Sequence, residues 1–172
     1  ELRFAPLPRP RRFEEQAVKT VIVVSDSHGN RAALDKLFPV FAESDYIIHL
    51  GDTSSDGLYI KKAFGDKTYL LNGNCDAAKL GADETVIEIE GVKIFACHGD
   101  RYGVKQGYDR LAYRAEEQGC QVALFGHTHR AVEFETGGVT LFNPGTLSRY
   151  CHNSYLYLVI NGEKAVGKIV EL

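Results

Sequence analysis

The sequence predicts an α/β domain made of two packed, mainly mixed β-sheets that are flanked by helices. Apolar β-branched runs alternate with helical periodicity in the first half of the chain, and apolar and polar residues alternate around glycines in the second half. At 172 residues the chain can form one domain that buries roughly 70% of the surface of its unfolded form. A core of that size needs no disulfides to support it.

The first half has the order strand, helix, strand, helix, strand. The run TVIVV predicts a strand that is buried on both faces, and the apolar spacing of RAALDKLFPVFAE predicts a helix that continues past its proline. We expect strands at 20–24, 45–50 and 67–72 and helices at 31–43 and 57–64. This order implies a parallel sheet with right-handed crossovers, in which ligands bind beyond the carboxyl ends of the strands.

The second half begins with a hairpin signature, because ETVIEIEGVKIFAC alternates on both sides of Gly91. A helix is expected from about Lys105 to Gln118. Further strands are expected at 121–125, 131–135, 139–143, 155–160 and 165–172. These strands predict a mostly antiparallel second half, so that two sheets pack together.

The opening residues, 1–19, differ from the rest in composition. Pro6, Pro8 and Pro10 stand among four arginines, a pattern that disfavours both helix and sheet. We interpret 1–19 as a flexible N-terminal extension or tag-derived arm and 20–172 as the folded domain. The basic residues of the arm could contact a membrane surface or an acidic partner, although a solvated tail is the simpler interpretation.

Composition excludes several classes of function. The formal net charge of −3 gives no indication of nucleic-acid binding. Four widely spaced cysteines without a CxxC pair predict neither a zinc knuckle nor a disulfide framework, and a reducing cytoplasmic location is expected. No apolar run approaches the roughly 20 residues of a membrane helix, so no membrane association is expected.

Seven polar residues follow the predicted strands, and each of them can bind a metal ion: Asp26, His28, Asp52, Asn74, His98, His127 and His129. Carboxylate oxygens and imidazole nitrogens suit manganese, zinc or iron. A single ion could not use all seven ligands, whereas seven ligands with one bridging carboxylate fit two ions about 3.5 to 4 Å apart. Two metal ions at this separation bind and stabilise the attacking and leaving oxygens in phosphoryl transfer.

Five motifs in the order DSH, GD, GN, CHG and GHTH resemble the signature of the calcineurin-like metallophosphoesterase superfamily. More narrowly, SDSHGN, HLGD, GNCD and NPGTLSR resemble its small bacterial and archaeal phosphodiesterase branch, over about residues 20–160. The resemblance implies a four-layer αββα sandwich. It also implies a metal-dependent enzyme that hydrolyses phosphoric esters.

The resemblance further implies a ligand set. One metal would be held by Asp26, His28, Asp52 and His129, and the second by Asp52, Asn74, His98 and His127. Asp52 would bridge the ions, and a hydroxide shared between them would attack phosphorus, since cation charge lowers the pKa of bound water. Catalytic roles are expected for Asp52, Asn74 and His98. The expected cofactor is a pair of Mn²⁺ ions, with Zn²⁺, Fe²⁺ or Ni²⁺ as alternatives.

The chain departs from the family pattern at Cys75, where many members carry a histidine that donates to the leaving oxygen. A neutral thiol is a weak donor, so diesters with good leaving groups should be hydrolysed more readily than alkyl monoesters. Alternatively, Cys75 packs as a small buried hydrophobic residue. Asp100 stands where relatives commonly carry histidine, and it either orients a ligand histidine or is only a turn residue.

Asn30 and Arg149 are candidate phosphate contacts, Arg149 because a guanidinium can bind two oxygens at once. Asn30 could instead cap the helix that follows it, and Arg149 could be a solvated loop residue. His49 lies within an apolar strand and is interpreted as a core histidine or a support for a ligand, not as a ligand itself.

The leading hypothesis is a dimetal phosphodiesterase with a small phosphodiester substrate. A protein-binding scaffold is the alternative from another class, because the retromer scaffold subunit of eukaryotes resembles the same fold; a phosphomonoesterase is the third. Exposed aromatic residues in YCHNSYLYL and an antiparallel sheet edge would allow a homodimer or homotetramer.

Overall fold

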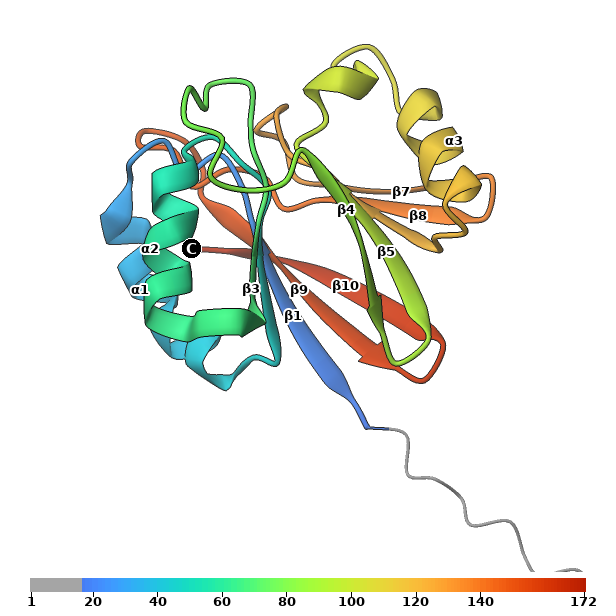
Figure 1. Ribbon diagram of the computed structural model, residues 1–172, viewed down its shortest axis with the longest axis horizontal. Helices are drawn as coiled ribbons and strands as arrows, with labels where there is room; N and C mark the ends of the chain where they lie inside the picture. Colours follow the sequence, from blue (N-terminus) through green and yellow to red (C-terminus); the bar gives the residue numbers. More distant parts are fainter. Residues whose placement is uncertain (1–16) are drawn as a thin grey trace, which may run out of the picture.

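The computed structural model describes residues 17–172 and contains two five-stranded sheets that pack face to face (Figure 1). Helices α1 (Arg31–Glu43) and α2 (Ser54–Phe64) cover the outer face of the first sheet, and α3 (Asp109–Glu117) covers the second. This arrangement confirms the predicted sandwich of helices and two mixed sheets. The predicted arm lies outside the described residues up to residue 16, and Lys19 already belongs to a strand.

The first sheet has the order β10-β9-β1-β2-β3. Its strands are β1 (Lys19–Val24), β2 (Tyr46–His49), β3 (Thr68–Leu70), β9 (Ser154–Asn161) and β10 (Lys164–Glu171). β1, β2 and β3 are parallel, as the βαβαβ order predicts, and β9 returns antiparallel to β1. The last two strands of the chain therefore extend the first sheet.

The second sheet has the order β4-β5-β6-β8-β7. Its strands are β4 (Glu84–Ile89), β5 (Val92–Cys97), β6 (Val122–Leu124), β7 (Val132–Thr136) and β8 (Val139–Asn143). The second half is mostly antiparallel as expected, since β4 pairs with β5, β7 with β8 and β9 with β10 in that way, but β5 pairs with β6 and β6 with β8 in parallel. The crossover through α3 and the hairpin strand β7 between β6 and β8 produce these parallel pairs.

Helix α3 begins four residues later than predicted, at Asp109. Residues 103–106 form turns instead, and Gly103 at φ 63° lies in the left-handed region. Glycine at 103 and 107 weakens helix formation, which explains the late start. A short 3₁₀ helix, η2 (Asp100–Tyr102), precedes these turns, and another, η1 (Gly65–Lys67), follows α2, which itself begins three residues earlier than predicted.

Three apolar clusters hold the layers together. The largest lies between the sheets, where Val21 and Val23 of β1 face Ile94 and Leu124 of the second sheet. The alternate β1 residues face α1 and α2, so β1 is buried on both faces as its apolar run predicts. The third cluster joins α3 to the second sheet. This packing fixes the carboxyl ends of the central strands of both sheets.

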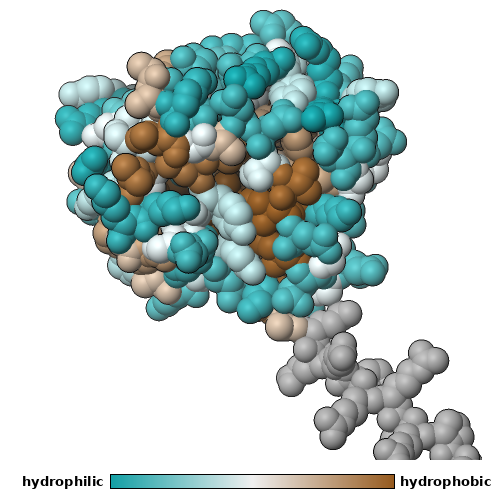
Figure 2. Space-filling model, viewed as in Figure 1, coloured by the Kyte–Doolittle hydropathy of each residue, from teal (hydrophilic) through white to brown (hydrophobic). Residues whose placement is uncertain are grey.

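Polar residues cover most of the face in Figure 2, with apolar patches in its middle. Among the described residues, no helix has the length and apolar character that crossing a bilayer requires.

Candidate metal centre

The loops at the carboxyl ends of five strands converge on one site. Asp26 and His28 follow β1, Asp52 follows β2, and Asn74 follows β3. His98 follows β5, and the pair His127 and His129 follows β6. Parallel strands present their carboxyl ends at the same edge of a sheet, which brings these loops together.

The structure places six of these side chains in two groups. Asp26, His28 and His129 form one group, and Asp52, His98 and His127 form the other; within each group one ligand atom per residue lies within 4.8 Å of the others. Each group takes side chains from both sheets. Asn74 joins the second group, since its Oδ1 lies 3.0 Å from Nε2 of His98.

The two groups are adjacent. His28 Nε2 lies 3.8 Å from Asp26 Oδ1 and 3.9 Å from Asp52 Oδ2, so it faces one carboxylate of each group. His98 Nε2 lies 3.4 Å from Asp52 Oδ2 and 4.0 Å from Asp26 Oδ1. Each carboxylate therefore has an imidazole from each sheet as a neighbour.

The hydrogen bonds of Asp26 leave one oxygen for a cation. Its Oδ2 accepts bonds from the Ser25 hydroxyl and from the backbone N–H of His127, the latter at 3.0 Å. Its Oδ1 is buried and accepts no hydrogen bond from any described residue, although His129 Nε2 lies 3.0 Å away. A buried carboxylate oxygen without a donor is costly, and a bound metal ion would satisfy it. The residues present therefore fit a metal.

The arrangement of the imidazoles also fits a bound cation. His98 Nδ1 donates to the carbonyl of Leu50 at 2.9 Å, which leaves the Nε2 lone pair facing Asp52 and Asn74. His28 and His129 bring their Nε2 atoms within 3.3 Å of each other. Two nitrogens at this distance need either a proton or a cation between them, and metal-ligating histidines have this arrangement.

Five candidate ligands have left-handed backbone conformations, which L-residues rarely adopt. They are Asp26 (φ 54°), His28 (φ 45°), Asp52 (φ 48°), His127 (φ 68°) and His129 (φ 60°). Such conformations carry a cost of order 1–3 kcal/mol each and persist where the surrounding structure enforces them. Here they turn the side chains of residues i and i+2 toward the same site.

Two glycines permit the close approach of these loops. A Cβ on Gly73 would clash with Oδ1 of Asp52, and a Cβ on Gly126 would clash with Ser25 Oγ and lie 2.7 Å from Oδ2 of Asp26. The glycines of the GN and GH motifs are therefore required because a carboxylate, or the serine hydroxyl bonded to it, occupies the space next to them.

A buried hydrogen-bond chain supports the loop that carries Asp26 and His28. His49 Nδ1 accepts from the Gly51 N–H, so Nε2 carries the proton and donates to Ser27 Oγ at 3.0 Å. Ser27 donates to Asp56 Oδ2 at 2.7 Å, which also accepts from the Gly29 N–H. Burial lowers the pKa of His49, which keeps it neutral. His49 thus supports the ligand loop, one of the two roles interpreted for it.

Asp76 supports the loops that carry Asp52 and Asn74. Its Oδ2 accepts the backbone N–H groups of Gly73 and Asp52, and its Oδ1 accepts that of Ser54. Asp76, Asp56 and Ser27 were not predicted from the sequence as functional residues. Their only signal was an acidic or hydroxyl residue within a motif loop, which is equally typical of ordinary turns.

Electrostatics differ between the carboxylates and the imidazoles of the second group. Burial tends to raise the pKa of Asp52, but the neighbouring His98 imidazole and the hydrogen bond from the Cys75 N–H hold it well below its ordinary value. Burial tends to lower the pKa of His98, but Asp52 and Asp26 raise it above its ordinary value. Burial and the charges of His98 and Lys105 lower the pKa of His127. The negative charges of Asp52 and Asp26 therefore favour a positive charge beside them, on His98 or on a bound cation.

Cys75 is exposed, so the alternative that it packs as a buried hydrophobic residue is wrong. Its backbone N–H donates to Asp52 Oδ1 at 2.8 Å, and its Sγ lies 3.5 Å from Nδ2 of Asn74. Partial burial and the neighbouring Asp52 raise the pKa of the thiol. The group is thus a neutral thiol at the edge of the site.

The other candidate residues belong to neither ligand group. Asn30 occupies the N-cap position of α1 but makes no capping bond; its amide donates instead to the carbonyl of Leu147 at 2.7 Å. Arg149 is exposed and makes no ion pair within residues 17–172. Asp100 begins η2 on the surface. Their phosphate-binding or orienting roles stay predictions.

Residues 20–164 match the family model described as the calcineurin-like phosphoesterase superfamily domain. The match covers well over half of the chain and includes every motif loop of the site. The chain therefore belongs to the calcineurin-like phosphoesterase superfamily, a class of metal-binding hydrolases, as its motifs predict.

Two curated relatives illustrate the match. Probable metallophosphoesterase YsnB of Bacillus subtilis is 35% identical over 128 residues, which are 74% of this chain and 74% of YsnB. Phosphodiesterase YfcE of Escherichia coli is 24% identical over 152 residues, a match that covers 79% of YfcE and 74% of this chain. Both relatives have names that agree with hydrolysis of phosphoric esters.

Solved structures share the fold. A conserved protein of Streptococcus pneumoniae TIGR4, described as a predicted phosphoesterase, aligns with a TM-score of 0.73 at 23% identity, over 91% of this chain and 99% of that chain. Vps29 of Entamoeba histolytica, complexed with Zn²⁺, aligns with a TM-score of 0.70 at 20% identity, over 88% of this chain and 98% of that chain. At these identities the likeness shows the fold alone.

Proposed function

We propose that this chain is a dimetal phosphoesterase that hydrolyses phosphodiesters. The observation that carries the proposal is the convergence of two ligand groups, each drawn from both sheets and each within 4.8 Å. One ion would be held by Asp26, His28, Asp52 and His129, and the other by Asp52, Asn74, His98 and His127. Asp52 is the proposed bridge because its Oδ2 faces both His28 and His98.

Two divalent ions bound there would activate water as the nucleophile and neutralise the phosphoryl oxygens. The chain's own residues prepare the site for them. The Cys75 N–H holds Oδ1 of Asp52, so that Oδ2 points inward, and the Leu50 carbonyl holds His98 in the tautomer that binds a cation. Mixed oxygen and imidazole ligands suit Mn²⁺ as the proposed metal, with Zn²⁺, Fe²⁺ or Ni²⁺ compatible.

The preference for diesters rests on Cys75. A neutral thiol is a weak proton donor at neutral pH, so the leaving oxygen must depart with little help from the exposed Cys75. Esters whose leaving group is already stable as an anion should therefore react best. The name of the relative YfcE, a phosphodiesterase, agrees with this preference.

The test compares hydrolysis of bis-p-nitrophenyl phosphate with that of p-nitrophenyl phosphate, after metal removal and after Mn²⁺ addition. The variant is Asp52→Asn, which keeps an oxygen for the Cys75 N–H but loses the bridging charge. Its rate should fall by more than about 100-fold, because even residues that only support a metal ligand change activity by about 10–100-fold. The control is Asp66→Asn, an exposed carboxylate in η1.

Manganese-dependent diester hydrolysis that is lost in Asp52→Asn and kept in Asp66→Asn is the expected result. Faster hydrolysis of the monoester would contradict the diester preference and favour a phosphomonoesterase. Full activity in Asp52→Asn would contradict the dimetal centre. In Cys75→His, monoester hydrolysis should rise if residue 75 faces the leaving oxygen.

A protein-binding role is the alternative function, and the fold shared with Vps29 is the observation that favours it. Docking alone would give no reason for an unpartnered Asp26 Oδ1 or for five left-handed ligand residues. Absence of turnover with either ester and with every metal tested would favour this alternative.

The proposal includes a small phosphodiester as substrate and a cytoplasmic location. Four free cysteines support a reducing compartment. A homodimer or homotetramer is also proposed, on the basis of the exposed Tyr150 and of Val166 on the edge strand β10.

A further inference from the structure

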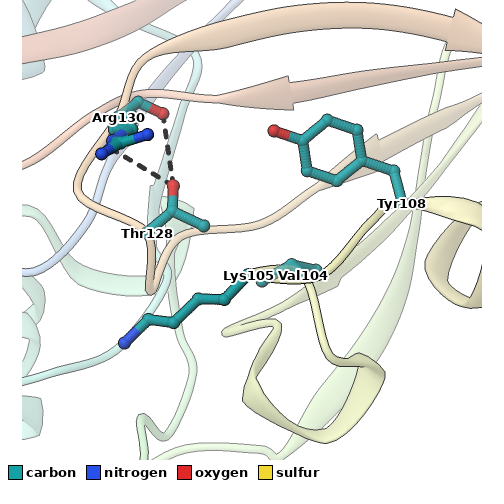
Figure 3. Close-up of a pocket in the computed structure, with 5 residues that line it drawn as sticks. All are labelled: Val104, Lys105, Tyr108, Thr128 and Arg130. Carbon is teal, nitrogen blue, oxygen red and sulfur yellow. Dashed lines mark hydrogen bonds between the residues drawn. The ribbon is translucent and has the colours of Figure 1, made fainter.

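A pocket of about 310 Å³ lies beside the candidate metal centre. Figure 3 shows its lining: Val104, Lys105, Tyr108, Thr128 and Arg130. Thr128 stands between His127 and His129, so the pocket and the centre share a single turn. This volume is at the lower end of the range of roughly 300–1,000 Å³ that small-molecule sites occupy.

The pocket is positively charged, although the chain has a net charge of −3. Lys105 and Arg130 contribute two cations, and no carboxylate is among the lining residues. Within residues 17–172, neither cation forms an ion pair, whereas Arg31, Arg101 and Arg114 all do. The positive charge of the pocket is therefore available to a ligand.

The walls of the pocket are fixed by packing. The Tyr108 ring lies 5.1 Å from that of Phe125 and 5.5 Å from that of Phe134, and its hydroxyl points toward Thr128 and Arg130 (Figure 3). The Thr128 hydroxyl accepts bonds from Nδ2 of Asn143 and from the Arg130 N–H. Thr128 thus holds the turn and the backbone of Arg130, and the side chains left to meet a ligand are Lys105, Arg130 and Tyr108.

We propose that this pocket binds a second phosphoryl group, so that the preferred substrate is a phosphodiester that carries a further phosphate. The inference rests on the proposed function, in which the scissile phosphoryl group lies at the metal centre. A guanidinium can bind two phosphate oxygens at once, an ammonium adds a point charge, and the Tyr108 hydroxyl can donate a hydrogen bond. Two cations that line one pocket beside the centre match a second anionic group near the first.

The kinetic test uses a matched pair of chromogenic diesters, thymidine 3′-(p-nitrophenyl phosphate) with and without a 5′-phosphate. The wild-type protein with Mn²⁺ should show a kcat/KM roughly tenfold higher for the ester with the 5′-phosphate, since one charge-assisted contact contributes that much. Lys105→Met and Arg130→Met should each lower the ratio of the two kcat/KM values toward one.

The control is Lys164→Met, which removes the same charge from the β9–β10 hairpin at the far end of the first sheet (Figure 1). It should keep the wild-type ratio. If Lys105→Met and Arg130→Met slow both esters equally, so that the ratio stays unchanged, the cations act on the scissile group and the subsite is refuted.

A binding measurement separates the failure of this inference from that of the proposed function. Isothermal titration calorimetry should give a roughly tenfold lower Kd for thymidine 3′,5′-bisphosphate than for thymidine 3′-phosphate, and both variants should lose the difference. Such a difference without any turnover would keep the subsite and refute hydrolysis. Turnover with equal affinities for the two nucleotides would keep the hydrolase and refute the subsite.

Discussion

The two sheets contribute different chemistry to the same centre. The loops of the first sheet bring both carboxylates, the Asn74 amide and one imidazole, whereas those of the second sheet bring three imidazoles. Neither sheet contains a complete ligand group, because each group combines residues of both. Metal binding should therefore depend on the docking of the two sheets.

The sheets also support their loops differently. Behind the Asp26 loop lies a buried chain of Ser27, His49 and Asp56. The turn that carries His127 and His129 is held by Asn143 and Thr128 at a more exposed position. The carboxylates therefore occupy a rigid part of the centre, and the imidazoles of the GHTH turn lie at its open side.

The largest effect should come from removing one metal ligand from the loops of either sheet. Asp26→Ala removes a ligand from the first group, and His127→Ala removes one from the second. Each variant should bind about one Mn²⁺ per chain instead of about two, and diester hydrolysis should fall more than about 100-fold. Metal content and initial rates check this, with Asp66→Ala as control; an unchanged metal content in either variant would contradict the two groups.

The next effect concerns the glycines beneath the carboxylates. Gly73→Ala would push against Asp52, and Gly126→Ala against Ser25 and Asp26; each should lower the free energy of unfolding by about 3 kcal/mol, since these buried side chains have little room to move. Gly107→Ala is the matched control, because a Cβ added at Gly107 would meet no atom within 4 Å. Urea unfolding measures all three, and equal stability of the three variants would refute the steric argument.

A smaller effect should distinguish the buried hydrogen bonds behind the Asp26 loop from the more exposed ones in the turn of His127 and His129. Ser27→Ala leaves the His49 N–H and Asp56 without their shared partner and should lower the free energy of unfolding by about 1–2 kcal/mol. Thr128→Val, in the open turn, should lower it by about 0.5–1 kcal/mol. Chemical denaturation of both variants checks the order, and a larger loss in Thr128→Val would mean that the open turn is the more rigid side.

The smallest effect lies away from the centre, at the amino end of β1. The Thr20 N–H, at 2.8 Å from its carboxylate, lowers the pKa of Asp45, and Lys19 adds to this. A lowered pKa contributes stability above the unfolded-state pKa of about 3.9, and this is lost as the pH falls through the folded-state value. The contribution should be less than about 1 kcal/mol, because the carboxylate is partly exposed and solvent screens it.

Asp45→Asn should therefore be slightly less stable than the wild-type protein at pH 7, and the difference should be smaller at pH 3. Thermal unfolding at the two pH values checks this prediction. A difference that grows toward acid pH would have the wrong sign.

Much of the fold could be predicted from the sequence because its signals are local. The β-branched run of β1 and the helical spacing of α1 each depend on neighbouring residues, and both elements form within one residue of their expected bounds. The parallel pairing of β6 with β8 was not predicted, because strand order depends on contacts between distant segments. The late start of α3 depends on turns that the periodicity conceals.

The sequence by itself determined the family, the two-sheet class and seven residues able to bind metal, because these follow from side-chain chemistry at the ends of apolar runs. Only the tertiary structure decided which of them meet, that Asp26 leaves one oxygen without a donor, and that Lys105 and Arg130 share a pocket beside His127. The physical reason is that distances between loops of different sheets are set by how the sheets pack, and no local pattern encodes that packing.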